Sequence, residues 1–284
     1  MKNFYYILLL LIIVSRIYAY ELINVDEIYS YQFAAGEVPA AAVFIKDSLF
    51  VLEAKKGEIF KINIKKGEVN RKFKLEDSVG AVGITYFDNK FFVPIPNKNK
   101  ICVYNKNFKK MYEIKVKDPT DIEFYKNTYI VVSNDGHKIL RFNSKTLDFI
   151  DEVGVMGFYE REFRYPFDLL IDKNGDIYVS EVINTRVQVL NNKFKFVKYI
   201  GKWGVSSGRF YRPKGIAFYK NYLLVADGFL GVIQLFDKKT GDLKYLLGKK
   251  GQLIKFKSPV RIRIYKDYLS VIDYFTKKLY VFRF

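Results

Sequence analysis

The stretch Gly201–Leu247 reads GKWGVSSGRFYRPKGIAFYKNYLLVADGFLGVIQLFDKKTGDLKYLL. A glycine-spaced loop and a Phe-x-x-Pro motif come first, and four short apolar runs follow, separated by Lys, Asn, Asp and Gly. The runs are Gly215–Phe218, Tyr222–Ala226, Val232–Phe236 and Leu243–Leu247. Because short apolar runs bounded by turn residues are typical of strands, the stretch predicts a four-stranded antiparallel unit.

The rest of the chain repeats this unit. The residue that begins the first strand recurs every 38 to 47 residues, at Pro39, Ala81, Pro119, Pro166, Pro213 and Pro259. The end of the second strand recurs in register, at Glu53, Ile95, Ser133, Glu181, Asp227 and Asp273. Such periods are typical of repeat architectures, and six copies predict an all-β, six-bladed β-propeller of four-stranded antiparallel blades.

The two ends of the chain should meet in the last blade. After the run Tyr280–Phe282 the chain stops, so the sixth copy lacks a fourth strand. The run Ile23–Tyr31 precedes the first copy and has no other partner. We therefore expect the N-terminal strand to close the sixth blade.

The copies resemble NHL repeats, which form six-bladed propellers. The fifth copy carries Gly201-x-x-Gly204, Phe210-x-x-Pro213 and Val225-Ala226-Asp227. The fourth carries Gly154-x-x-Gly157, Phe163-x-x-Pro166 and Ile177-Tyr178-Val179. The resemblance is strong over 154–284 and weak over 34–118, where the proline and the acidic residue are partly lost. It implies a propeller fold, with activities that range from binding to catalysis.

Residues 1–19 have the features of a signal peptide: Lys2, the aliphatic run Ile7–Val14 and a small residue, Ala19, at a cleavage position. The run is too short to span a bilayer, which favours cleavage. The alternative is an uncleaved anchor, because Arg16 lies close to the apolar run. We expect the propeller to cover 20–284, to be secreted or periplasmic, and to have no transmembrane span after cleavage. Cys102 is the one cysteine, which excludes an internal disulfide and favours a small buried residue.

The formal net charge is +18. Such a balance is compatible with an anionic surface as partner, but the lysines are spread through the turns of every copy. No clustered basic and aromatic motif is present, which argues against nucleic-acid binding.

The position two residues after the start of each first strand should lie beside the central channel. Asp121, Asp168 and Arg261 occupy it in three copies and are the predicted ligand-binding residues at the channel mouth. Two carboxylates facing one cation could hold a polar ligand. The alternative is a solvated ion pair at the channel rim.

Two further sets of residues recur between strands. The acidic residues that end the second strands, Glu53, Glu181, Asp227 and Asp273, are expected to accept backbone N–H groups in turns. Phe163, Phe210 and Phe256 should pack between blades. Trp203, Tyr159 and Phe229 fall outside that register and are the predicted interface residues, because exposed aromatic side chains often anchor partners.

The sequence contains few combinations of residues that could form a catalytic site. Amidating lyases among the NHL propellers hold zinc with several histidines, whereas this chain has only His137. Related lactonases hold a channel metal with Glu, Asp and Asn, and Glu53, Asp121, Asn134 and Asp168 could form such a set for Ca²⁺. We therefore predict an exported, non-catalytic scaffold for a protein or glycan partner, without a cofactor. The alternative is a metal-dependent hydrolase or lactonase with its site in the channel.

Overall fold

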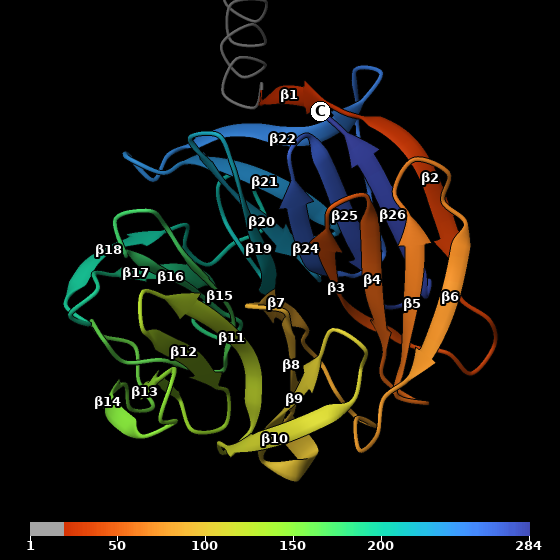
Figure 1. The fold of residues 1–284 in the computed structure, drawn as a ribbon. Helices are drawn as coiled ribbons and strands as arrows, with labels where there is room; N and C mark the ends of the chain where they lie inside the picture. The colour runs from red at the N-terminus through yellow and green to blue at the C-terminus, as the bar shows by residue number, and fades with distance from the viewer. Residues whose placement is uncertain (1–19) are drawn as a thin grey trace, which may run out of the picture.

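The computed structural model describes residues 20–284, so the predicted signal peptide, 1–19, lies outside the described residues. Six sheets, antiparallel except for one added parallel strand, form the blades of a ring, and their first strands gather round its centre (Figure 1). Besides strands, the described residues contain one short 3-10 helix, Pro96–Lys98. They contain no helix long and apolar enough to cross a membrane. The predicted six-bladed β-propeller is confirmed.

The first three blades comprise residues 39–153. Blade 1 contains β3 (Pro39–Ile45), β4 (Ser48–Glu53), β5 (Glu58–Asn63) and β6 (Val69–Lys74). Blade 2 contains β7 (Thr85–Phe87), β8 (Lys90–Ile95), β9 (Lys100–Asn105) and β10 (Lys110–Lys115). Blade 3 contains β11 (Pro119–Tyr125), β12 (Thr128–Ser133), β13 (Lys138–Asn143) and β14 (Phe149–Val153).

The other three blades comprise residues 166–283 and the N-terminal strands. Blade 4 contains β15 (Pro166–Ile171), β16 (Ile177–Glu181), β17 (Arg186–Leu190) and β18 (Phe196–Ile200). Blade 5 contains β19 (Pro213–Tyr219), β20 (Tyr222–Asp227), β21 (Val232–Asp237), β22 (Leu243–Lys249), β23 (Gln252–Leu253) and β1 (Glu21–Asn24). Blade 6 contains β24 (Pro259–Tyr265), β25 (Tyr268–Asp273), β26 (Lys278–Arg283) and β2 (Asp26–Gln32).

The N-terminal segment closes the ring, as expected, but it serves two blades. Strand β2 pairs antiparallel with β26 and completes blade 6. Strand β1 pairs parallel with β22 and extends blade 5. Val25 separates the two strands; its side chain is buried in the core between these blades, and its N–H donates to the carbonyl of Gly248 at 2.9 Å. The segment thus joins neighbouring blades besides filling the last one.

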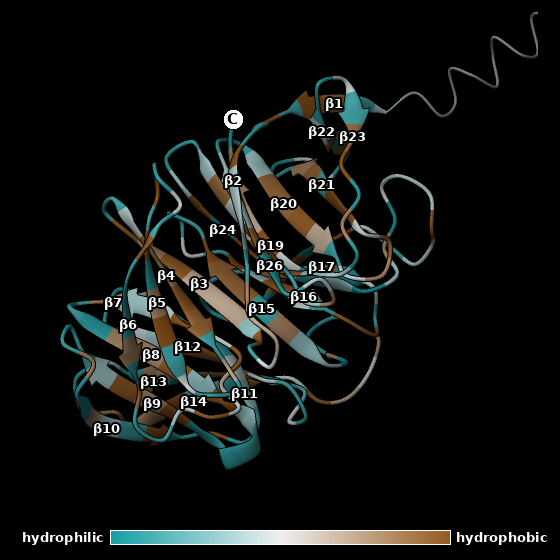
Figure 2. Ribbon diagram, turned by 90° about the vertical axis from the view of Figure 1, so that its right-hand side faces the viewer, coloured by the Kyte–Doolittle hydropathy of each residue, from teal (hydrophilic) through white to brown (hydrophobic). Residues whose placement is uncertain are grey.

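The core is divided among the blade interfaces. The buried apolar residues form six clusters, one between each pair of neighbouring blades. Inner strands such as β20 are mostly hydrophobic, whereas the outer strand β10 is mostly hydrophilic (Figure 2). Phe163, Phe210 and Phe256 are buried in three of these clusters, as predicted. Cys102 is buried in the cluster between blades 1 and 2, as predicted.

Two ends of the propeller follow from this topology. The connections between blades and the turns between second and third strands lie at one end, here called the loop face. Hydrogen bonds join them there: the N–H of Phe256, in the connection to blade 6, donates to the carbonyl of Gly231 in the turn of blade 5. The hairpin turns between first and second, and between third and fourth, strands lie at the opposite end, here called the hairpin face.

Candidate functional site

The centre of the propeller holds a buried ionic cluster. Arg261 on β24 contacts Asp168 on β15 through Nη1, and its Nη2 donates to the carbonyl of Thr120 at 2.7 Å. The same Nη1 lies 3.7 Å from the Asp121 carboxylate on β11. The side chains of both aspartates are fully buried, and that of Arg261 is 1% exposed. The three predicted residues therefore meet, but the alternative of a solvated rim pair is wrong.

Arg263 belongs to the same cluster and was missed from the sequence. Its Nη1 and Nη2 each lie 3.0 Å from an oxygen of Asp168, in a bidentate contact. Nη2 also lies 3.5 Å from Asp121. Arg263 is two residues after Arg261, so its side chain lies on the same face of the strand. That spacing was the signal available in the sequence.

The carboxylates also join the blades through the backbone. Asp121 accepts the N–H of Leu169 in blade 4 at 3.1 Å, and Asp168 accepts the N–H of Ile216 in blade 5 at 2.8 Å. In blade 5 the corresponding position is Gly215, where a Cβ atom would lie 2.8 Å from the backbone nitrogen of Ile262. The aspartates therefore link the first strands of successive blades by hydrogen bonds. The absence of a side chain at Gly215 allows the first strand of blade 6 to approach closely.

The pKa values of the two aspartates are shifted in opposite directions. Burial raises the pKa of Asp121 well above its usual range, and the neighbouring charge of Asp168 raises it further. Burial also disfavours the charged form of Asp168, but Arg261 and Arg263 outweigh it and hold the pKa of that carboxyl below its usual range. The mutual repulsion contributes to this difference, because neighbouring carboxylates disfavour each other's ionisation.

A cavity of about 270 Å³ lies above this cluster on the loop face. Its walls include Ala40, Phe167, Lys214 and Val260, each the second residue of a first strand, and Val82, which precedes β7. The guanidinium of Arg261 lies 4.4 Å from the Phe167 ring centre and donates to the carbonyl of Val82 at 3.3 Å. The ionic cluster thus lies beneath the cavity, behind Phe167 and Val82, but does not line it.

The acidic residues at the ends of the second strands organise the loop face. Asp227 accepts the N–H groups of Phe229 and Leu230 in its own turn, at 3.0 and 2.8 Å. It also accepts those of Tyr211 and Arg212 in the preceding connection, at 2.7 and 3.0 Å. Glu53, Glu181 and Asp273 accept backbone N–H groups in the same way. Their predicted architectural role is confirmed.

The predicted interface residues are exposed on the loop face. The exposed fractions are 79% for Tyr159, 68% for Trp203 and 60% for Phe229. The connection that carries Trp203 is anchored by Phe210, whose N–H donates to the carbonyl of Lys202 at 2.8 Å. Phe229 stacks on Tyr211 with ring centres 4.1 Å apart. The aromatic side chains are therefore displayed from fixed loops.

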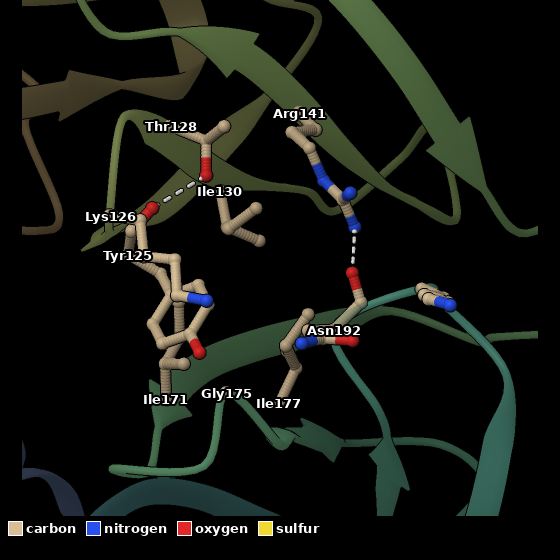
Figure 3. Close-up of a pocket in the computed structure, with 10 residues that line it drawn as sticks. Tyr125, Lys126, Thr128, Ile130, Arg141, Ile171, Gly175, Ile177 and Asn192 are labelled. Carbon is tan, nitrogen blue, oxygen red and sulfur yellow. Dashed lines mark hydrogen bonds between the residues drawn. The ribbon is translucent and has the colours of Figure 1, made fainter.

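A second pocket, of about 280 Å³, lies between blades 3 and 4 on the hairpin face (Figure 3). Its rim is already bonded across: Arg141 donates to the carbonyl of Asn192 at 2.8 Å, and Tyr125 donates to that of Asn174 at 3.3 Å. A Cβ atom at Gly175 would lie 2.6 Å from the Tyr125 ring. These contacts indicate that the pocket is part of the packing interface between blades 3 and 4.

The metal ligands proposed from sequence are bound to protein groups. Asp121 and Asp168 face arginines, Glu53 accepts the N–H of Lys56 at 2.6 Å, and Asn134 donates to the carbonyl of Pro166 at 2.7 Å. Asp77, Cys102 and Glu113 lie close enough for a metal, but the two carboxylates are paired with Lys98, Lys100 and Lys110. The Ca²⁺ site stays a prediction.

Comparison with known proteins shows the fold alone. The sequence matches no protein-family profile and no curated protein. In structure, the chain is similar to a protein of unknown function from Bacteroides thetaiotaomicron, with a TM-score of 0.70 and 10% identity over 93% of this chain and 74% of that one. It is similar to an inactive virginiamycin B lyase from Staphylococcus aureus, with a TM-score of 0.66 and 12% identity over 90% and 98% of the two chains. It is also similar to hydrazine synthase from Kuenenia stuttgartiensis, with a TM-score of 0.63 and 12% identity over 88% and 97%.

Proposed function

We propose that this protein is an exported propeller of NHL type that binds a protein partner through the loop face of blades 4 to 6. The observation that carries the proposal is the exposure of Tyr159, Trp203 and Phe229 on that face. Exposing large aromatic side chains to water is unfavourable, and a patch of them marks an interaction site. Aromatic side chains also contribute much of the binding free energy at protein interfaces.

The neighbouring side chains favour a protein over a glycan. Met156 and Val205 are 65% and 71% exposed in the same connections. The guanidinium of Arg164 lies 4.6 Å from the Phe158 ring centre. Aromatic residues, methionine and arginine are enriched at protein interfaces, whereas aliphatic side chains offer a sugar hydroxyl no hydrogen bond. A mixed aromatic and aliphatic surface therefore fits an apolar protein surface best.

The centre of the ring favours binding over metal-dependent hydrolysis. A channel metal of the lactonase kind needs free carboxylate oxygens, and Asp168 gives both of its oxygens to Arg261 and Arg263. The guanidinium groups supply the positive charge that a metal would supply, so the cluster is complete as an ion network.

The test compares co-purification from cells of the source organism. We expect the triple variant Tyr159→Ser, Trp203→Ser and Phe229→Ser to lose a specific partner that the parent protein retains. Phe149→Ser is the matched control, because Phe149 is an aromatic residue of similar exposure, 54%, on the outer strand of blade 3. Equal recovery of the same partner with the triple variant would contradict the proposal, and release of a bound glycan instead would identify the other partner class.

A further inference from the structure

The cavity on the loop face has one charged group in an otherwise uncharged wall. Its lining residues are Val38, Ala40, Ala54, Gly80, Ala81, Val82, Phe167, Lys214, Val260 and Tyr274. Of these, only Lys214 carries a charge. Apart from its amine and the Tyr274 hydroxyl, the side chains that form the cavity offer no polar atom. A ligand with one anionic end and an apolar remainder matches this distribution.

Lys214 is a cation without a carboxylate partner. Among residues 20–284, its Nζ takes part in no hydrogen bond or salt bridge, and it lies 5.6 Å from the centre of the Phe167 ring. Its side chain is half-buried. Removing an ammonium group from water costs free energy when no partner compensates the charge. The blade therefore holds a partly desolvated charge beside a cavity.

The surrounding charges are positive. Burial lowers the pKa of Lys214, and the nearby cations Arg212 and Arg261 lower it further. Arg261 is compensated by Asp168 beneath the cavity, whereas no acidic residue lines the cavity. An anion bound in the cavity would therefore relieve repulsion between Lys214 and its two neighbours.

We propose that this cavity binds a small monocarboxylate with a short, unbranched apolar chain, whose carboxylate contacts Nζ of Lys214 and whose chain packs on Ala40, Val82 and Val260. The volume of about 270 Å³ is below the range of drug-sized ligands, which suits a short chain. The Phe167 ring, held in contact with Arg261, forms the wall next to the ammonium. The cavity lies on the same face as the proposed protein-binding surface, but Tyr159, Trp203 and Phe229 do not line it.

Isothermal titration with hexanoate tests the proposal on the propeller, residues 20–284. We expect saturable binding to the parent protein and at least tenfold weaker binding of 1-hexanol, since a hydrogen bond between charged groups is stronger than one to a neutral hydroxyl. Lys214→Met should weaken hexanoate binding at least tenfold. The control is Lys202→Met, because Lys202 is an exposed lysine in the connection before blade 5 and lines no part of the cavity.

A second variant keeps the test independent of the charge. Ala40→Leu fills the cavity from blade 1 and leaves Lys214 in place, so it should abolish hexanoate binding while the melting temperature stays near that of the parent. The absence of binding by acetate, butanoate, hexanoate and octanoate to the parent protein would overturn the proposal. Equal affinities of the parent and Lys214→Met would also overturn it.

Discussion

Arg261 in blade 6 donates from Nη2 to the carbonyl of Thr120 in blade 3, at 2.7 Å. The bond crosses the centre of the ring between first strands that are not neighbours. Nη2 also donates to Val82 in blade 2, while Nη1 contacts Asp168 in blade 4. One side chain thus joins four blades, and it closes the channel beneath the loop-face cavity.

Removing this side chain should destabilise the propeller. Arg261→Met leaves Asp168 buried with only Arg263 as its partner. Breaking a buried ion pair by removing one partner costs about 3–5 kcal/mol, and we expect a loss of that size in the free energy of unfolding. Denaturant titration measures it. A loss below about 1 kcal/mol would show that Arg263 alone compensates the aspartates.

Gly201 should be intolerant of a side chain. Its φ is +71°, and a Cβ atom would lie 2.1 Å from Cε2 of the buried Phe210 ring. Gly201→Ala should therefore cost about 1–2 kcal/mol for the left-handed backbone and about 1–3 kcal/mol more for the clash. Gly251→Ala is the matched control, with φ +75° and nothing within 4 Å. Equal losses in the two variants would mean that Phe210 moves away at no cost.

The N-terminal strands should hold the ring closed. Deleting 20–33 removes β1, β2 and the buried side chains of Val25 and Phe33. Burial of each such side chain contributes about 1.5–3 kcal/mol, and the melting temperature should fall by about 10 °C or more. Deleting 20–24 removes only β1 and should cost less. An unchanged melt of the longer deletion would contradict closure by β2.

Glu123 should make stability depend on pH. Burial raises the pKa of this half-buried carboxyl to about 7, with Asp168 adding to the shift and Arg263 opposing it. Between the ordinary pKa and about 7, the folded state holds a proton that the unfolded state releases, so this group lowers stability as pH rises. Glu123→Gln should therefore gain stability relative to the parent between about pH 5 and about pH 8. If the free energies of unfolding of the variant and the parent differed by the same amount at every pH, this would contradict the raised pKa of Glu123.

The sequence was informative where a position repeats. Recurring prolines, apolar runs and strand-end acids predict the blades, because each copy meets the same packing demand. The division of the N-terminal run at Val25 was not predictable, since it depends on two blades that meet only in the closed ring. Arg263 was missed because one copy alone carries it, although its spacing from Arg261 places it on the same strand face.

The burial of the central cluster also lay beyond sequence reasoning. Asp121, Asp168 and Arg261 occupy equivalent positions in their copies, which predicts that they meet. Their exposure depends on how far the side chain of Arg261 extends across the ring. The repeat register does not predict that distance. Lys214 was overlooked because lysines are common throughout the chain, and only the structure shows that this one lines the loop-face cavity.

Photo-cross-linking at position 203 tests the proposed function most directly. In one variant, a photoreactive amino acid would replace Trp203 on the loop face. In a control variant, it would replace Lys145, an exposed residue in a turn of the hairpin face. In cells of the source organism, the account predicts a discrete cross-linked protein from position 203, its loss when Tyr159→Ser and Phe229→Ser are added, and none from position 145. No cross-link at 203, or the same product from both positions, would contradict it.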